Sequence, residues 1–417
     1  TDARADARRS DWRRNRLVGA DPVLSVAPKG AFGGHLLLRS AGFGTGASHI
    51  TDVNTEARTD LARGITVAGL RSDAAPIKLA HFDTCGYDGT IEDVPSPYHS
   101  ISQVLAAYDG FFGGFAVLTH DSAICDQPAD LHTLFANTPF TAWPAIGYRT
   151  PYVGFIDAAG LAHEYSGPAG TALVVEARNQ LLPGAAATQQ PRDALPRIAH
   201  AGGALAAMTY TNALEALAAN HTAYDLIEID LSWTSDGALV CLHDWADIPG
   251  PSGLGPQMTR AGFDAYAATL PYRPCVLESL AAWLRDTPGV RIVTDVKADN
   301  LEALKVIATR YPDLIDRFVP QLYQPSEYPV ARSLGFKDVI WTLYRFDGDD
   351  AAVLRWLPLM DLYGLVMPEA EGRRGLARAA LQTTGVRSWV HTVNDPETLK
   401  ELRLLGVSDV MTDHMPP

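Results

Sequence analysis

Short apolar runs alternate with amphipathic segments along the second half of the chain. The apolar runs lie at 198–199, 226–231 with an extension at 238–242, 290–296, 318–323, 339–344, 364–367, 389–393 and 409–412. Segments with helical spacing lie at 213–219, 277–285, 301–311, 328–334, 351–357, 374–382 and 396–405. Eight alternations in about 220 residues predict a (β/α)8 TIM barrel over 197–417. A doubly wound sheet fits the alternation too, but the polar residues that gather after the strands favour the barrel.

The first half of the chain has a weaker and more mixed pattern. A smaller mixed α/β domain is predicted over residues 17–181, with no role that the pattern identifies. Residues 1–16 are polar and arginine-rich, as expected of a flexible arm, and residues 182–196 have the composition of a linker. Strand-like runs lie at 23–26, 35–38, 115–118, 152–156 and 172–175, and helix-like segments at 100–108 and 130–136.

Composition narrows the class of protein. Of the 417 residues, 47% are hydrophobic and 20% are charged, which is ordinary for a globular protein. The net charge of -14 argues against nucleic acid as a partner. No apolar run is long enough for a transmembrane segment, so a soluble protein is expected, cytoplasmic or exported with its signal segment removed. The four cysteines are scattered without a CxxC pair, which argues against a zinc site or a disulfide framework.

Carboxylates cluster on the predicted barrel strands. Glu228 and Asp230 are two residues apart in one strand, so they project from the same face. Asp295 and Lys297 have the same spacing on the next strand. Two like charges this close need a cation between them, and three carboxylates without cysteine suit one hard divalent metal ion, Mg²⁺ or Ca²⁺.

Other chemically capable residues fall at the ends of the same strands. His200 and His243 flank the predicted metal site and can act as general acid and base. Lys297 supplies fixed positive charge for an anionic transition state, so the set suits hydrolysis of a phosphodiester. Further residues are expected to line a pocket for a small phosphodiester or a phospholipid head group: Gln321, Tyr323, Trp341, Tyr344, Arg345 and His391.

Taken in order, these motifs resemble those of the glycerophosphodiester phosphodiesterase family, within the barrel superfamily of phosphatidylinositol-specific phospholipase C. The resemblance implies that Glu228, Asp230 and Asp295 bind one divalent metal, and that His200 and His243 are the acid–base pair. It also implies that Lys297 stabilises the phosphate, and that a substrate hydroxyl attacks phosphorus to give a cyclic phosphate that water opens. The matching residues are His200-Ala201-Gly202-Gly203, Tyr210-Thr211-Asn212-Ala213-Leu214, Glu228-Ile229-Asp230, Thr234-Ser235-Asp236-Gly237, His243-Asp244, Asp295-Val296-Lys297, His391-Thr392-Val393-Asn394 and Thr412-Asp413.

The sequence departs from the family pattern at three positions. Ala201 stands where the family has an arginine that grips the phosphate, which removes a contact worth roughly 1.5–3 kcal/mol. Thr211 replaces a glutamate, and Asp295 replaces a glutamate that is one methylene longer. The missing arginine and the Asp-x-Lys are more similar to the sphingomyelinase D branch of the superfamily, so the phosphodiesterase class is better supported than the glycerophosphodiester substrate.

Two alternatives remain open from the sequence. The first is a non-catalytic or weakly active barrel that binds a metal and a phosphodiester but has Ala201 in place of the phosphate-binding arginine. A cation supplied at the barrel mouth by Arg345 or by the first domain would favour catalysis over binding. The second is a lyase or transferase that stops at the cyclic phosphate.

Overall fold

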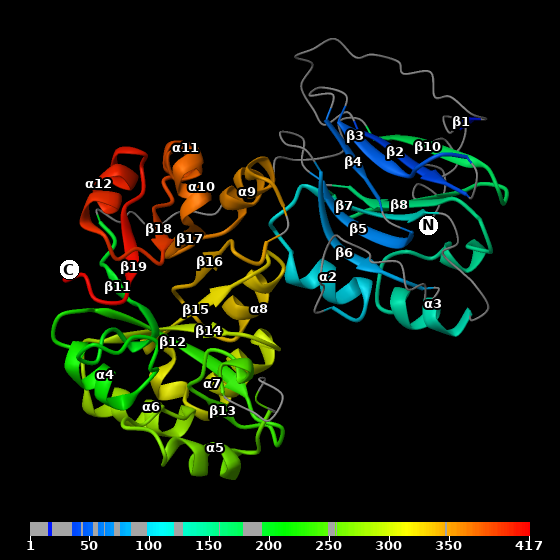
Figure 1. Ribbon diagram of the computed structural model, residues 1–417. Coiled ribbons are helices and arrows are strands. Elements are labelled where there is room, and N and C mark those ends of the chain that lie inside the picture. The colour runs from blue at the N-terminus through cyan, green and yellow to red at the C-terminus, as the bar shows by residue number, and fades with distance from the viewer. Residues whose placement is uncertain are drawn as a thin grey trace. The chain divides into compact units, whose positions relative to one another are not determined.

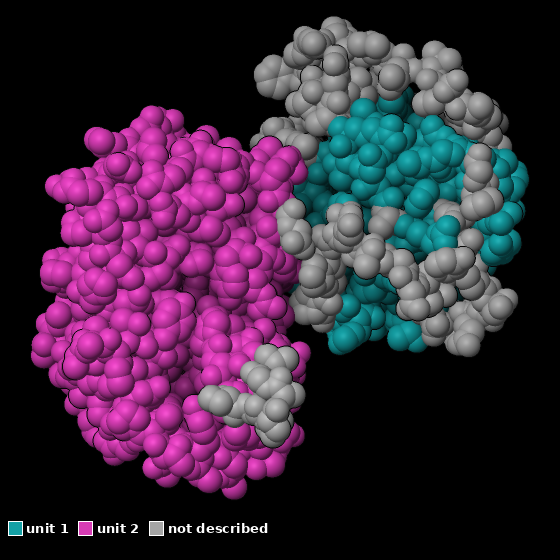
Figure 2. All heavy atoms as spheres, viewed as in Figure 1, with its two compact units in different colours: residues 1–186 teal, residues 187–417 magenta. Residues whose placement is uncertain are grey.

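The computed structural model describes residues 16–18, 36–42, 45–52, 57–61, 63–70, 76–84, 98–120, 128–157, 159–177, 194–248, 255, 257–346 and 348–417. The chain divides into two compact units, residues 1–186 and residues 187–417, which Figure 2 colours separately. The predicted arm up to residue 15, the predicted strand at 23–26 and the linker up to residue 193 lie outside the described residues.

Unit 2 is the predicted TIM barrel (Figure 1). Eight parallel strands pair in chain order, and the ring closes because β11 pairs with both β12 and β19. All eight strands coincide with apolar runs that were predicted as strands. Their bounds are β11 Ile198–Ala199, β12 Leu226–Trp233, β14 Arg291–Val296, β15 Phe318–Leu322, β16 Ile340–Thr342, β17 Gly364–Pro368, β18 Ser388–His391 and β19 Asp409–Thr412.

Helices follow the barrel strands in turn. The run at 238–242 does not extend the barrel: its strand β13, Leu239–Val240, folds back antiparallel on β12. The α-helices are α4 Leu214–Asn220, α5 Arg260–Ala267, α6 Leu277–Asp286, α7 Asn300–Arg310, α8 Glu327–Ser333, α9 Asp350–Trp356, α10 Glu369–Arg374, α11 Leu376–Thr384 and α12 Pro396–Leu404. Short 3₁₀ helices are η2 His200–Gly202, η3 Trp245–Asp247, η4 Pro312–Arg317 and η5 Leu357–Leu359.

The barrel interior changes from apolar to polar along its strands. One buried cluster joins neighbouring strands through residues such as Leu226, Val293 and Ile340. Side chains two residues further along a strand share the same face. The residues at those positions are Glu228, Asp295 and Thr342, so the polar layer lies directly beyond the apolar one, toward the carboxyl ends of the strands.

Unit 1 is a sheet domain with two described α-helices, α2 Ile101–Ala107 and α3 Pro128–Phe135. The strand order is β1-β10-β2-β7-β5-β6, with β3 and β4 added beside β2, and β8 and β9 beside β7. The sheet is antiparallel apart from β2 and β7. Its strands are β1 Arg16–Val18, β2 Leu36–Ala41, β3 His49–Asp52, β4 Ala57–Asp60, β5 Gly64–Leu70, β6 Ile77–Phe82, β7 Gly114–His120, β8 Tyr152–Ile156, β9 Ala162–Ser166 and β10 Ala172–Ala177; a 3₁₀ turn, η1, spans Trp143–Ala145.

The expectation against disulfides is wrong for one pair of cysteines. Cys241, which follows β13, is bonded to Cys275, which precedes α6. Spacing in the sequence hid the pair because 34 residues separate the two cysteines, and the β13 hairpin and α5 bring them together. Cys85 and Cys125 lie outside the described residues. Among the described helices, none combines the length and the apolar character needed to cross a membrane.

Candidate active site

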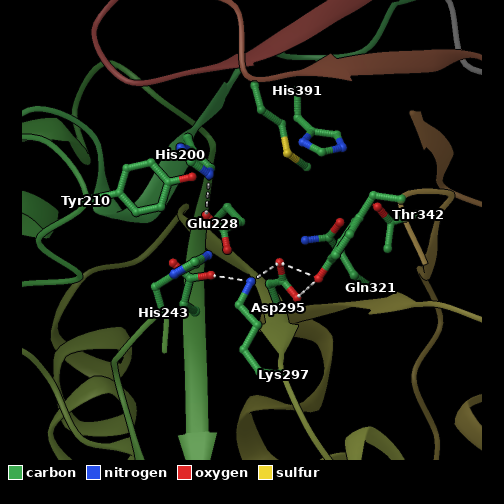
Figure 3. Close-up of a pocket in the computed structure, with 12 residues that line it drawn as sticks. His200, Tyr210, Glu228, His243, Asp295, Lys297, Gln321, Thr342 and His391 are labelled. Atoms are coloured by element: carbon green, nitrogen blue, oxygen red, sulfur yellow. Dashed lines mark hydrogen bonds and ion pairs between the residues drawn. The ribbon is translucent and has the colours of Figure 1, made fainter. Parts of the chain in front are cut away.

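A pocket of about 200 Å³ opens at the carboxyl ends of the barrel strands (Figure 3). Nine of the twelve site residues expected from the sequence line it. They are His200, Glu228, Asp230, His243, Asp295, Lys297, Gln321, Tyr344 and His391. Tyr210, Thr342 and Met411 complete the lining.

Three buried carboxylates form the floor of this pocket. Asp230 on β12 is the register partner of Asp295 on the neighbouring strand β14. Glu228 lies two residues before Asp230 on β12, so the two side chains share one face of the strand. One oxygen from each carboxylate lies within 4.8 Å of the others. This cluster can hold a metal ion, and its all-oxygen donor set suits a hard divalent cation.

Lys297 neutralises only part of this charge. Its Nζ lies 2.9 Å from Asp230 Oδ1 and 2.8 Å from Asp295 Oδ2. Burial favours the neutral amine, but the two carboxylates outweigh it and raise the pKa of Lys297. Burial also favours neutral Asp295, yet Lys297 and the two tyrosine hydroxyls that donate to it lower the pKa of Asp295.

Glu228 is the carboxylate that this arrangement leaves short of positive charge. Burial, together with the negative charges of Asp230 and Asp295, raises the pKa of Glu228 well above its usual range. Its Oε2 accepts a hydrogen bond of 2.7 Å from the Ala201 amide. Its Oε1 is buried and has no hydrogen-bond partner among the described residues. An unpaired carboxylate oxygen facing two more carboxylates is what a cation site requires before the cation is added.

His200 enters the pocket from the end of β11. The backbone turns sharply after it, because Ala201 has a φ of 48° and Gly202 a φ of 88°. His200 Nδ1 lies 2.9 Å from Asp413 Oδ1, and its Nε2 lies 3.9 Å from Glu228 Oε2. The Asp413 carboxylate therefore accepts a hydrogen bond from Nδ1–H of His200, and Nε2 is left directed at the pocket.

Asp413 is itself fixed by the end of the barrel. Asn394 Nδ2 donates to Asp413 Oδ2 at 2.6 Å, and Asn394 Oδ1 accepts from the Asp413 amide and from the Thr412 hydroxyl. Asp413 and Asn394 were matched to family motifs but received no role from the sequence. Their function depends on a contact with His200 across 213 residues of chain, which no local pattern reveals.

His243 lies on the same side of the pocket as His200, on the loop that follows β13 (Figure 3). Its Nδ1 lies 2.8 Å from Asp247 Oδ2, so its Nε2 is also left for a substrate. The side chain of His243 is 40% exposed, compared with 10% for His200. The Cys241–Cys275 disulfide anchors this loop two residues before His243.

Tyr210 stands between the two histidines. Its ring centroid lies 4.5 Å from that of His200 and 5.4 Å from that of His243, edge-on in both cases. Burial and the nearby charge of Asp230 raise the pKa of Tyr210 to about 12, so its hydroxyl remains a donor.

Asn212, two residues on, exchanges two hydrogen bonds of 3.0 Å with Asp230. No role could be assigned to Tyr210 and Asn212 from local sequence patterns, because both residues adopt left-handed backbone conformations (φ 61° and 47°) that such patterns rarely indicate.

The wall opposite the histidine pair is polar but uncharged. Gln321 and Thr342 face the pocket from β15 and β16, and His391 faces it from the end of β18 (Figure 3). Burial, with His200 nearby, lowers the pKa of His391 to about 4, so the ring is neutral at pH 7. Thr342 Oγ1 and His391 Nε2 have no hydrogen-bond partner among the described residues, which leaves both available to a bound molecule.

Three expected residues lie outside the pocket lining. Trp341 alternates with Thr342 on β16, so its side chain points away from the pocket and is fully buried against Phe346. Tyr323 lies beneath the site, where its hydroxyl contacts Asp295. Arg345 stays at the rim: Nη1 donates to the Lys297 carbonyl at 2.9 Å, and the guanidinium lies 4.7 Å from the centre of the Tyr323 ring.

No protein-family profile matches the chain, and a search of curated proteins finds no match. Among solved structures, the barrel half is similar to many glycerophosphodiester phosphodiesterases. A putative enzyme from Agrobacterium tumefaciens is 19% identical, with a TM-score of 0.43, over 53% of this chain and 94% of that one. An enzyme from Parabacteroides distasonis is 19% identical, with a TM-score of 0.41, over 52% and 92%. A phosphodiesterase from Oleispira antarctica, solved with the product sn-glycerol-3-phosphate, is 17% identical, with a TM-score of 0.40, over 53% and 93%.

Proposed function

We propose that this chain is a divalent-metal-dependent phosphodiester hydrolase that acts on glycerophosphodiesters or related phospholipid-type phosphodiesters. One observation carries the proposal. Three buried carboxylates, one with an unpartnered oxygen, lie between two histidines that each bind a separate carboxylate through Nδ1. A metal site flanked by two oriented acid–base groups is what in-line displacement at phosphorus requires.

The charge of the cluster supports a divalent cation. With all three carboxylates ionised, the cluster and the one ammonium would carry two negative charges in a buried site, and Mg²⁺ or Ca²⁺ would balance them. Glu228, Asp230 and Asp295 would hold the ion, which when bound supplies charge neutralisation for the phosphate oxygens. Lys297 keeps Asp295 ionised and contacts both Asp230 and Asp295, and the hydroxyls of Tyr323 and Tyr344 donate to Asp295.

The two histidines would move the protons of the reaction. One takes a proton on Nε2 from the attacking hydroxyl, and the other donates a proton from Nε2 to the departing alkoxide. In each ring the Nδ1–carboxylate contact fixes the tautomer and stabilises the cation that forms when Nε2 is protonated. The neutral polar wall of Gln321, Thr342 and His391 suits the hydroxyl groups of an uncharged head group such as glycerol.

A second candidate, a barrel that binds phosphodiesters without turning them over, is favoured by one observation. Among the described residues that line the pocket, Lys297 is the only lysine or arginine, and it is engaged by two carboxylates. Ala201 supplies a backbone amide and no side-chain cation, and Arg345 is held at the rim.

Hydrolysis assays with matched variants separate the two candidates. With glycerophosphocholine and bis(p-nitrophenyl) phosphate as substrates, His200→Ala is expected to lower kcat/KM by roughly 10²–10⁴-fold. Glu228→Gln and treatment with EDTA are expected to abolish activity, and Mg²⁺ or Ca²⁺ to restore it in the EDTA-treated protein. His221→Ala and Glu302→Gln, which change a partly exposed histidine and an exposed glutamate outside the pocket, are the controls.

Three outcomes decide between the candidates. Full activity in EDTA and in Glu228→Gln would rule out the metal-dependent hydrolase. Metal binding by calorimetry, without turnover of either substrate, would favour the binding barrel. Phosphorus NMR of the product separates a ring-opened phosphate from a cyclic one, and therefore a hydrolase from a cyclising lyase or transferase.

A further inference from the structure

A second pocket, of about 390 Å³, adjoins the candidate active site. The two pockets share Tyr210 and His243 in their linings. They differ in the number of charged side chains that line them. The metal pocket contains three carboxylates and a lysine, whereas Asp247 is the one charged residue among the described residues that line the second pocket, apart from the shared histidine. Most of its walls are apolar or aromatic: Leu242, Ile248, Phe263, Tyr266, Leu270 and Tyr272.

The walls of this aromatic pocket belong to a well-anchored part of unit 2. Phe263 of α5 is fully buried with Val240 and Val276, and Tyr266 packs against the same cluster. The Cys241–Cys275 disulfide joins the two chain segments beneath this cluster, and the Cys241 amide also donates to the Cys275 carbonyl at 2.8 Å. A cavity whose walls are held by a disulfide and a packed helix does not close by collapse of its own side chains, so it is available to a ligand.

Tyr210 marks the junction of the two pockets. Its ring stands edge-on between His200 and His243, and 46% of the residue is exposed. A molecule whose phosphate lies between the two histidines therefore has the aromatic pocket directly beside its reacting centre. Thr211, in the same lining, has a buried hydroxyl without a partner among the described residues, which can donate to an ester or ether oxygen at the junction.

The surface next to Tyr210 is apolar as well. Leu205 and Met208 exchange backbone hydrogen bonds of 2.8 and 3.0 Å, which form a tight hairpin after Gly203. Ala206, Ala207 and Met208 at its tip are exposed. This small apolar surface precedes Tyr210 in the chain and is compatible with an amphiphilic substrate.

We infer that the aromatic pocket binds a single hydrocarbon chain of the substrate whose phosphate lies in the metal pocket. This inference rests on the proposed function and narrows it. The substrate would be an amphiphilic phosphodiester with one polar head group and one alkyl or acyl chain, as in a lysophospholipid. The neutral polar wall and the aromatic pocket then receive the two chemically different arms on either side of one phosphate.

A series of phosphodiesters with one head group and straight alkyl chains of two to ten carbons, used as monomers with Mg²⁺, tests this assignment. We expect kcat/KM to rise roughly fourfold for each methylene until the pocket is filled, the factor that corresponds to burying one CH₂. Leu270→Glu, at the partly exposed edge of the pocket, is expected to remove the dependence on chain length while leaving the shortest substrate unaffected. Ala265→Glu, which places the same charge on an exposed position of α5 outside the pocket, is the control and is expected to keep the slope.

Calorimetry with a matching series of non-hydrolysable alkyl phosphonates gives a second readout that does not need turnover. Affinity is expected to rise with chain length, with a negative heat-capacity change as apolar surface is buried. Hydrolysis and binding that are both independent of chain length would overturn the assignment of the pocket and leave the hydrolase intact. Affinity that depends on chain length, without hydrolysis of any substrate, would uphold the pocket and overturn the hydrolase. Because both series are measured first on the wild-type protein, the test stands even if Leu270→Glu does not fold.

Discussion

The two histidines of the candidate active site make the same contact, from Nδ1 to a carboxylate, in different surroundings. His200 and His243 each bind a carboxylate through Nδ1, at 2.9 and 2.8 Å. His200 is buried at the junction of the first and last barrel strands, and its partner Asp413 is itself hydrogen-bonded. His243 is partly exposed on a loop outside the barrel, and its partner Asp247 is mostly solvated.

The difference shows two ways to orient an acid–base group. On the His200 side, a buried network fixes the ring, so each hydrogen bond lies in a low dielectric and is costly to break. On the His243 side, the backbone is fixed instead, by the disulfide at Cys241 and by the short turn η3. Removing a polar partner should therefore have a large effect at His200 and a small one at His243, whereas removing the covalent link should affect mainly His243.

The largest effect is expected from Asp413→Asn. Asn394 presents an amide donor to one oxygen of Asp413, and its own oxygen is engaged by Thr412 and by the Asp413 amide, so it cannot reverse. The new asparagine would place its oxygen toward Asn394 and its NH₂ group toward His200. His200 would then carry its proton on Nε2, and kcat/KM should fall by roughly 10²–10⁴-fold, the range for general acid–base catalysis.

Nitrogen NMR of the histidine rings measures this directly. The His200 proton should move from Nδ1 in the wild-type protein to Nε2 in Asp413→Asn, while metal affinity and Tm change little. Asp286→Asn, at the exposed end of α6, is the matched control. An unchanged tautomer with wild-type kcat/KM would show that Asp413 does not orient His200.

The next largest effect is expected from breaking the Cys241–Cys275 link with a double Cys→Ser substitution. The loop-closure relation for a separation of 34 residues gives a loss of about 3–4 kcal/mol in the free energy of unfolding. Below the melting temperature, kcat/KM should fall on the order of tenfold, because the loop that carries His243 loses its anchor. Metal affinity should stay unchanged, because all three carboxylates lie on β12 and β14.

Denaturant titration and calorimetric metal binding test the two halves of this prediction. If the double variant lost metal affinity in parallel with activity, the disulfide would support the whole barrel mouth and the contrast between the two histidines would fail. Ala→Ser at an exposed, unrelated position such as Ala351 controls for the introduction of a small polar side chain.

The same contrast explains how much of the site the sequence could predict. The barrel strands and the carboxylate cluster follow from alternation: Glu228, Asp230 and Asp295 lie on strands whose apolar and polar positions recur every two residues. Contacts between residues that lie far apart in the sequence produce no such local pattern. The His200–Asp413 contact joins residues that follow the first and the last strand of the barrel. The Cys241–Cys275 disulfide depends on the hairpin of β12 and β13, which lies outside the barrel ring.

The direction of individual side chains could also be predicted only in part from the apolar runs of the sequence. Trp341 was expected to line the pocket, yet alternation on β16 directs Thr342 inward and Trp341 outward. In unit 1, the strands β3, β4, β5, β6 and β9 had no recognised signal in the sequence. β5 is buried along its whole length, and such a strand lacks the alternation by which a half-buried strand is recognised.

The smallest effect is expected from Asp247→Asn. This substitution makes the same change of carboxylate to amide as Asp413→Asn, but at the exposed histidine. Solvent-exposed ion pairs contribute little, and no second side chain among the described residues holds the Asp247 carboxylate, so a new amide can present its oxygen to His243. We therefore expect kcat/KM to fall by at most about fivefold. The deficit should shrink further in high salt, which screens the wild-type pair as well. A steady-state comparison of both Asp→Asn variants at low and high ionic strength is the measurement. Equal losses at the two positions would mean that burial of the partner does not distinguish the two histidines.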